Sequence, residues 1–231
     1  MTSGAIILCR MDSRRLPGKT LTEIDDGHPL LWYSLVRTRE VPAFAGRVYV
    51  ATSDRAVDDP IAAWCARQGV AVYRGDTDDV CGRFVAAADH FELNTAARVN
   101  GDCPLTDPGL LALGQRTMDQ GEYDLVTNLK PRSFPYGIAV EIVRIETLRA
   151  AHAVMRRPEH REHVTSYLYD HLDRFRFFNL CHDAGPTNLS AMLLTVDLPV
   201  HLDLFRQFVR ETPGDWRSVD YMDAVRRGGF A

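Results

Sequence analysis

The sequence predicts an α/β protein built on a mostly parallel sheet, for two reasons. Four short apolar runs have the length and composition of buried strands, at residues 5–9, 47–52, 70–73 and 96–99. Segments with helical spacing of apolar residues follow the first three runs. Strands that alternate with helices at this spacing are joined by right-handed crossovers, so the strands run parallel and are covered by helices.

A strongly basic loop follows the first strand. The run at 5–9 ends at Arg10, and the loop also carries Arg14, Arg15 and Lys19 around a Leu-Pro-Gly turn signal. Ligands of open α/β sheets bind beyond the carboxyl ends of strands, and arginine and lysine bind phosphate oxygens. We therefore expect a triphosphate-binding loop. A solvated basic loop is the alternative, and the patterns G-x-x-x-x-G-K-S/T and G-x-G-x-x-G are both absent from it.

The following elements continue the alternation. Residues 27–31 begin a helix with Pro29 in its first turn, and Leu31 and Leu35 give that helix a buried face. The second strand leads to a helix through 61–67. The third leads to a helix from about 76 to 91 whose start is rich in aspartate, which suits the positive end of a helix dipole.

The fourth strand delivers a candidate metal ligand, Asp102, between Gly101 and a proline-containing turn. Mg²⁺ prefers one or two carboxylates together with phosphate oxygens and water. Helix capping is the alternative role for this residue. Asp107, directly before Pro108, is better placed to cap the next helix.

The pattern loosens after residue 128. Residues 138–143 predict a strand, and a charged helix begins near 158. His160 and His163 are three apart without H-E-x-x-H, so a charged helix start is favoured over a zinc site. Residues 192–197 predict a strand ending at Asp197 before a proline-led helix, where Asp197 is either a helix cap or a ligand.

The length, composition and net charge of the chain argue against several classes of protein. The chain has 231 residues, 45% of them hydrophobic and 25% charged, as in soluble folded proteins. A net charge of −4 argues against a general nucleic-acid binder. The five cysteines include no C-x-x-C pair, which indicates reduced thiols. The first apolar run is too short for a signal peptide or membrane span. We expect a cytoplasmic protein with no membrane or nucleic-acid partner.

The basic loop also carries a family resemblance. Its sequence Cys9-Arg10-Met11-Asp12-Ser13-Arg14-Arg15-Leu16-Pro17-Gly18-Lys19 resembles A-R-M-x-S-x-R-L-P-G-K, with Cys9 in place of alanine. That pattern opens the nucleotidyltransferases that activate acidic sugars. The chain is most similar to the branch named after spore coat polysaccharide biosynthesis proteins, in the acylneuraminate and 3-deoxy-manno-octulosonate cytidylyltransferase superfamily. The resemblance runs from about residue 5 to 204.

Five further segments resemble motifs of that superfamily. R-G-x-x-D-D-V-x-x-R-F at 74–84 corresponds to the motif for the nucleotide base, and G-D-C-P-L at 101–105 to the motif for the metal. P-x-G-x-x-V-E at 135–141 and R-E-H-V-T at 161–165 correspond to motifs on the acceptor side. T-V-D at 195–197, before Pro199, corresponds to the motif for the second metal ligand. Around T-V-D the family's polar residues are replaced by Leu193, Leu194, Leu198, Val200 and His201.

The resemblance implies a three-layer α/β/α fold of the nucleotide-diphospho-sugar transferase (GT-A-like) type. A single domain would span residues 1–231, with a β-rich acceptor and dimerisation arm at about 129–182, in a homodimer. It also implies an enzyme that couples CTP to an acidic acceptor with Mg²⁺ as cofactor and releases pyrophosphate. The acceptor would be a sugar acid such as a nonulosonate, or a phosphonate or phosphate compound.

The site residues that the resemblance implies fall into four groups. Catalytic residues are Lys19, Arg10 and Asp102. The nucleotide would contact Leu8, Cys9, Arg10, Met11, Arg15, Lys19, Gly75, Asp79, Arg83, Asn100 and Asp102. The acceptor would contact Tyr136, Glu141, Arg161 and His163. Asp102 and Asp197 would hold the metal.

Three alternatives stay open. A guanylyl- or uridylyltransferase acting on a sugar phosphate would differ only in the base pocket. A glycosyltransferase of the same fold would usually carry D-x-D, which the loop at Asp102 lacks. A nucleotide-binding sensor without turnover would keep the basic loop. No Ser-His-Asp or Cys-His motif supports a covalent intermediate.

Overall fold

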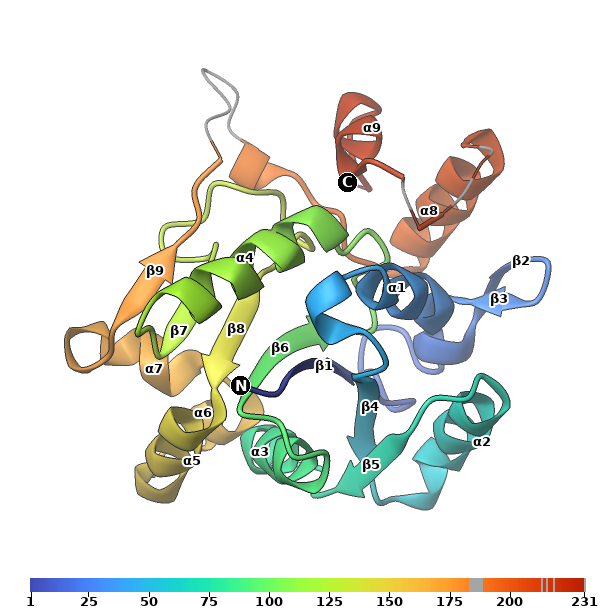
Figure 1. Cartoon of the computed structure of the whole chain (residues 1–231). Helices are drawn as coiled ribbons and strands as arrows, with labels where there is room; N and C mark the ends of the chain where they lie inside the picture. Colours follow the sequence, from blue (N-terminus) through green and yellow to red (C-terminus); the bar gives the residue numbers. More distant parts are fainter. Residues whose placement is uncertain (183–188, 213, 215, 218, 231) are drawn as a thin grey trace.

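The computed structural model describes residues 1–182, 189–212, 214, 216–217 and 219–230. A seven-stranded sheet forms the middle of the molecule, with helices on both faces (Figure 1). Its strands are β1 (Ser3–Leu8), β4 (Val48–Ser53), β5 (Val72–Gly75), β6 (Thr95–Asn100), β7 (Leu125–Thr127), β8 (Glu141–Arg144) and β9 (Phe177–Asn179). A separate two-stranded sheet pairs β2 (Glu23–Asp25) with β3 (His28–Pro29).

The longer helices follow the strands along the chain. They are α1 (Leu30–Arg39), α2 (Asp59–Arg67), α3 (Val80–His90), α4 (Pro108–Gln120), α5 (Ile145–Val154) and α8 (Pro199–Glu211). Shorter ones are α6 (Pro158–Glu162), α7 (Ser166–Asp170) and α9 (Tyr221–Arg226). Asp107 caps α4 by accepting the Leu110 N–H at 2.7 Å, as predicted. Pro29 directly precedes α1 instead of lying in its first turn.

The sheet has the order β5-β4-β1-β6-β8-β7-β9 and is mostly parallel, as predicted. Strands β5, β4, β1 and β6 pair in parallel with one another, and so do β7 and β9. Only β8 runs against its neighbours β6 and β7 within this sheet. Because β1 and β6 are parallel, Leu8 lies beside Asn100 and the loops after both strands leave the same edge of the sheet.

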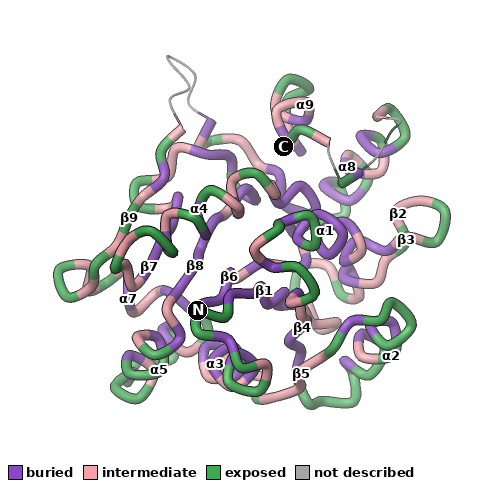
Figure 2. Tube along the Cα trace, viewed as in Figure 1, coloured by how far each residue is buried: buried purple, intermediate pink, exposed green. Residues whose placement is uncertain are grey.

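The core lies on both faces of β1, all of whose residues are buried. Side chains of a strand alternate between faces. Accordingly Ile7 packs among buried residues of α1, α2 and α4, whereas Ile6 packs among residues of α3, α5 and α7. In Figure 2 the buried trace is concentrated along the central strands and the exposed trace along the outer helices. A third core cluster joins α1 to α8 and α9 through residues such as Tyr33 and Phe205.

The prediction of a strand at 192–197 is wrong. The only bridge in this stretch joins Leu193 to Tyr136. Its other backbone hydrogen bonds go to loops: the Val196 N–H donates to the Asp102 carbonyl at 3.0 Å. Leu194 and Val196 are buried against the C-terminal helices and not in the sheet. The apolar pattern identified a buried extended segment but not its packing partner.

The segment 129–182 is an integral part of the central sheet. It supplies β8, between β6 and β7, and β9 at one edge, and it also carries α5, α6 and α7. It is therefore more helical than the β-rich arm we expected, and its role in a dimer stays a prediction. None of the helices in the described part of the chain has the length and apolar composition of a membrane-spanning segment.

Arg37 ties α1 to two distant segments of the chain. Its side chain is fully buried and faces three backbone carbonyls. Nε donates to Thr106 O at 2.7 Å, and the two Nη atoms donate to Trp216 O at 2.8 Å and Val219 O at 2.7 Å. Burial lowers the pKa of Arg37 from its usual value. These bonds hold the C-terminal segment against α1.

We expect Arg37→Met to lower the free energy of unfolding by about 2–6 kcal/mol, because the two buried carbonyls, of Thr106 and Trp216, each cost about 1–3 kcal/mol when they lose their donor. Thermal unfolding measures the change. Arg39→Met is the matched control, since Arg39 is exposed on the same helix and its contacts are 3.4 Å long. Equal midpoints for the two variants would show that Arg37 does not tie the chain together.

Candidate functional site

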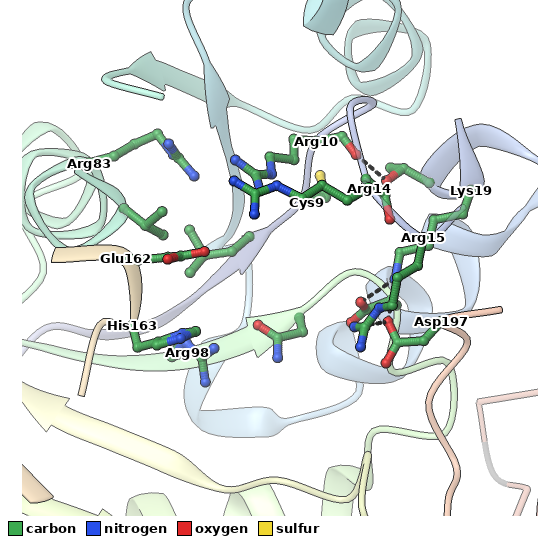
Figure 3. Close-up of a pocket in the computed structure, with 16 residues that line it drawn as sticks. Cys9, Arg10, Arg14, Arg15, Lys19, Arg83, Arg98, Glu162, His163 and Asp197 are labelled. Atoms are coloured by element: carbon green, nitrogen blue, oxygen red, sulfur yellow. Dashed lines mark hydrogen bonds and ion pairs between the residues drawn. The ribbon is translucent and has the colours of Figure 1, made fainter. Parts of the chain in front are cut away.

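A cavity of about 450 Å³ opens at the carboxyl ends of β1 and β6. Residues from the loop after β1, the end of β6, α3, and the segments before α7 and α8 converge on it (Figure 3). Of the predicted site residues, those that line it are Leu8, Cys9, Arg10, Arg15, Lys19, Arg83, Asn100, Asp102, His163 and Asp197. The fold therefore brings together residues up to 189 positions apart, between 8 and 197, at one edge of the sheet.

The loop after β1 is held in one shape by hydrogen bonds. Gly18 adopts a left-handed conformation, with φ of 78°, and its N–H donates to Met11 O at 2.8 Å. The Thr20 hydroxyl donates to Arg10 O at 2.9 Å. These bonds close the loop into a compact turn, and the short helix that begins at Lys19 follows it. Met11 lies in this turn and does not line the cavity.

Asp58 fastens the loop to the rest of the sheet. Its side chain is fully buried, and its Oδ1 accepts the Met11 N–H at 2.7 Å. Its other oxygen accepts the N–H and the hydroxyl of Ser53 at the end of β4. The carboxylate thus fixes the loop after β1 to the neighbouring strand. Sequence reasoning missed this residue because it carries no motif.

Lys19 lies between the two aspartates that the sequence offered as metal ligands. Its Nζ donates to Asp102 Oδ2 at 2.6 Å, to Asp197 Oδ1 at 2.8 Å and to Val196 O at 2.9 Å. The Lys19 side chain is 8% exposed. Burial lowers its pKa, but the two carboxylates outweigh burial and raise the pKa above its usual value.

Asp197 does not cap the helix that follows it. The residue before α8 is Leu198, and no side chain caps this helix. The Asp197 carboxylate instead accepts from Lys19 and from Arg15, whose Nη2 lies 2.8 Å from the same oxygen, Oδ1. The helix-cap interpretation of Asp197 is therefore wrong.

The remaining cations surround the cavity. Arg10 pairs with Asp12 at 3.3 Å, and the exposed Arg14 extends beside it (Figure 3). Arg83 approaches from α3 and is 3% exposed, with its Nη1 bound to the carbonyls of Asp76 and Thr77. Its Nε is buried without a hydrogen-bond partner, and burial followed by nearby Arg10 lowers its pKa. Such a set of cations suits a polyanion.

Gly75 and Asp79 support Arg83 from outside the cavity. A Cβ at Gly75 would lie 3.3 Å from Arg83 Cγ and 2.9 Å from the Tyr73 ring, so glycine leaves room for the arginine. Asp79 caps α3 by accepting the Gly82 N–H at 2.7 Å. Its carboxylate also accepts from His152 at 2.8 Å and from Arg161. Asp79 therefore ties α3 to α5 and α6.

A second cavity of about 250 Å³ adjoins the first, and Arg98, Asn100 and His163 line both. Arg98 forms an ion pair with Glu141, which is 1% exposed. Glu141 also accepts the hydroxyls of Thr165 and, at 2.9 Å, Tyr169. Glu141 lines the second cavity, as predicted for an acceptor residue, and its charge holds Arg98 in the wall between the cavities.

The other predicted acceptor residues differ in whether they reach a cavity. Tyr136 is 52% exposed and lines the second cavity, with the Arg132 guanidinium 4.6 Å from its ring centre. His163 is exposed at the junction. Arg161 lines neither cavity, because it is engaged by Asp79. Arg98 and Arg132 both line the second cavity, and arginine side chains suit anionic oxygens.

Sequence reasoning missed Arg98 and Arg132. Arg98 interrupts an apolar strand, and a charge within a buried strand is a signal that could have been used. Arg132 lies in an irregular segment between β7 and β8, where no periodicity indicates which way a side chain points.

Comparisons with known proteins agree with this architecture. The sequence model of a family described as "Cytidylyltransferase" matches residues 4–217. The spore coat polysaccharide biosynthesis protein SpsF of Bacillus subtilis is 33% identical over 177 residues, covering 74% of this chain and 71% of the relative. A 3-deoxy-manno-octulosonate cytidylyltransferase of Mesorhizobium japonicum is 31% identical over 148 residues, covering 63% of this chain and 56% of the relative.

Two solved structures resemble the fold. A cytidylyltransferase from Leptospira borgpetersenii has a TM-score of 0.90 at 28% identity, covering 98% of this chain and 93% of that one. A CMP:2-keto-3-deoxy-manno-octonic acid synthetase complexed with CTP has a TM-score of 0.66 at 19% identity, covering 91% of this chain and 99% of that one. The second likeness concerns the fold alone. Together they confirm the predicted fold class.

We expect Asp79→Asn to lower the free energy of unfolding by about 1–3 kcal/mol, because a partly buried helix cap loses its charge and its ionic partners. Although burial raises the pKa of Asp79, the Gly82 N–H and His152 hold it below its usual value. The contribution is therefore complete above about pH 4, the usual aspartate pKa, and is lost as pH falls.

Thermal unfolding of Asp79→Asn between pH 7 and pH 3 measures this contribution, with Asp78→Asn as control. Asp78 is an exposed neighbour on the same turn. The deficit of Asp79→Asn should narrow toward pH 3. A deficit that is absent at pH 7, or as large for Asp78→Asn, would contradict the role of Asp79 as a tie between helices.

Proposed function

The chain belongs to the cytidylyltransferase family, and on that premise we propose that it transfers the cytidylyl group of CTP to an acidic acceptor in a Mg²⁺-dependent reaction. Membership in the family confirms the resemblance drawn from the motifs and makes the chain a nucleotidyltransferase enzyme. The observation that supports the specific reaction best is the arrangement of the basic loop 10–19 opposite Asp102 and Asp197 across one cavity.

The basic loop provides the binding energy for the triphosphate. Arg10, Arg14, Arg15 and Lys19 all line the cavity from one closed loop, so their charges face a single volume. Arginine pairs bidentately with phosphate oxygens, and lysine acts as a compact charge. The base would lie toward Arg83, which lines the cavity on the side away from Asp197 (Figure 3).

The two aspartates fit a divalent cation. Asp102 Oδ2, Asp197 Oδ1 and Val196 O all lie within 2.9 Å of one point, the Lys19 ammonium, and form a set of hard oxygen donors. Among the described residues, no group of three or more His, Cys, Asp and Glu side chains could hold a metal. Mg²⁺ is typically held by one or two carboxylates, completed by phosphate oxygens and water.

The reaction is an in-line displacement. An acceptor oxygen forms a bond to the α-phosphorus of CTP, the bond from that phosphorus to the bridging oxygen of the β-phosphate breaks, and pyrophosphate leaves. A hydroxyl acceptor releases one proton in this step, and a phosphonate oxygen releases none. Bound Mg²⁺ would supply Lewis-acid neutralisation of phosphate charge. Lys19, Arg10 and Arg15 neutralise the charge that builds on the phosphate oxygens and the leaving group.

The second cavity is the proposed site of the acceptor. The two cavities share Arg98, Asn100 and His163 as lining residues. An acceptor bound in the second cavity would therefore lie next to a triphosphate bound in the first. The lining of the second cavity includes Arg98, Arg132 and Glu141, and the charge of Glu141 is balanced by its ion pair with Arg98. The net charge presented to a ligand is positive. This supports an acidic acceptor, of which sugar acids and phosphonates are the two classes we propose.

Release of pyrophosphate from CTP tests the proposal, with Mg²⁺ and a panel of 3-deoxy-manno-octulosonate, N-acetylneuraminate, 2-aminoethylphosphonate, glucose and glycerol. We expect release with at least one acidic compound and with neither neutral one. Asp102→Asn should reduce the rate by about 100-fold or more, as losses of preorganised charge stabilisation do, while it keeps a cooperative thermal transition. Release with the neutral compounds alone, or an Asp102→Asn enzyme as fast as wild type, would contradict the proposal.

A further inference from the structure

The carboxylate pair Asp102 and Asp197 already holds a cation that belongs to the chain itself. The Lys19 ammonium donates to one oxygen of each carboxylate, at 2.6 and 2.8 Å, and to the Val196 carbonyl at 2.9 Å. All three of its protons are thereby used. Two of these oxygens belong to Asp102 and Asp197, the carboxylates proposed to hold Mg²⁺.

The charges around the pair are balanced without any metal. Arg15 Nη2 lies 2.8 Å from Asp197 Oδ1, the same oxygen that Lys19 contacts. Two carboxylates therefore face one ammonium and one guanidinium, and no net negative charge is left to attract a divalent cation. An ammonium and a divalent cation cannot share one position between the same oxygens, because both are positive and they would lie in contact.

A triphosphate offers Lys19 and Arg15 other partners. Both residues line the cavity that the basic loop surrounds, and the lysine side chain is flexible along its four carbons. The backbone at Lys19 stays fixed by the turn at Gly18. The ammonium can thus swing from the carboxylates to phosphate oxygens while the loop keeps its shape.

We propose that Lys19 is the resident counter-ion of Asp102 and Asp197 in the nucleotide-free protein, so that the pair takes a divalent cation only when a triphosphate draws Lys19 away. This inference rests on the proposed function, because it takes the triphosphate as the ligand of the loop. Nucleotide and metal then bind cooperatively. The triphosphate removes Lys19 from the carboxylates that the metal needs, and the metal occupies the carboxylates that would otherwise hold Lys19 away from the triphosphate. The free protein is then protected from unproductive metal binding.

Titration with Mn²⁺ in the absence of nucleotide tests the inference, with free Mn²⁺ measured by electron paramagnetic resonance. We expect Lys19→Met to bind Mn²⁺ about tenfold or more tightly than wild type. Adding Asp197→Asn to Lys19→Met should abolish the gain. Lys130→Met is the matched control: it removes the same charge from an exposed position that lines neither cavity and should bind like wild type.

The unfolding midpoint gives a second readout without turnover. Lys19→Met leaves the two carboxylates with Arg15 alone to balance them, and therefore with a net negative charge. Mg²⁺ should thus raise the unfolding midpoint of this variant while leaving that of wild type unchanged. Lys19→Gln, which keeps a hydrogen-bond donor, serves if the methionine variant unfolds. It should show the same gain in Mn²⁺ affinity.

Two results would overturn the inference. Wild type that binds Mn²⁺ without nucleotide as tightly as Lys19→Met would show that Lys19 does not exclude the metal. Lys19 variants that fold and gain no affinity would show that the carboxylates form no cation site. The Mn²⁺ titration contains no nucleotide, so its result does not depend on whether the protein transfers a cytidylyl group. The proposed function is tested separately by the pyrophosphate-release assay, where no release with any acceptor would contradict it.

Discussion

The contact of Lys19 with Asp102 and Asp197 is the constraint on which the site depends. It joins the loop after β1 to residues 83 and 178 positions away, and thereby closes the cavity from three segments of the chain. A buried ion pair costs desolvation energy and is weak evidence for stability. The fold retains it here where two strand ends meet, which is where ligands of α/β sheets bind. Its position indicates a role in ligand binding, with structural cohesion as a secondary effect.

Parallel pairing supplies the geometry that this contact needs. Gly101 allows the loops after β1 and β6 to approach, because a Cβ there would lie 2.9 Å from Cys9 Cβ. Asp58 fixes the basic loop to β4, and Arg37 holds the C-terminal segment through backbone carbonyls. A buried charged residue also fixes the geometry on the acceptor side, where Glu141 orients Arg98 between the two cavities. Both sides therefore present arginines held in place by buried carboxylates or by fixed backbone.

Much of the fold was predictable from the sequence, because the apolar runs of β1, β4, β5 and β6 and the Asp107 cap are local signals. The basic loop was predictable for the same reason, although its roles in binding and catalysis stay predictions. What failed depends on tertiary contacts. Residues 192–197 look like a strand, yet they pair with loops. No local signal shows that Arg161 turns to Asp79. A charge within a buried strand marks Arg98 as unusual, but it does not show which cavities that residue lines.

The most direct test of the central claim is thermal unfolding with each of the four nucleoside triphosphates, with and without Mg²⁺. A ligand at about a hundred times its dissociation constant adds about 2.7 kcal/mol, which is several degrees for a chain of this length. The account predicts that CTP with Mg²⁺ raises the midpoint most and that Mg²⁺ alone does not raise it. A midpoint unchanged by every triphosphate, or raised equally by all four, would contradict a site built for CTP.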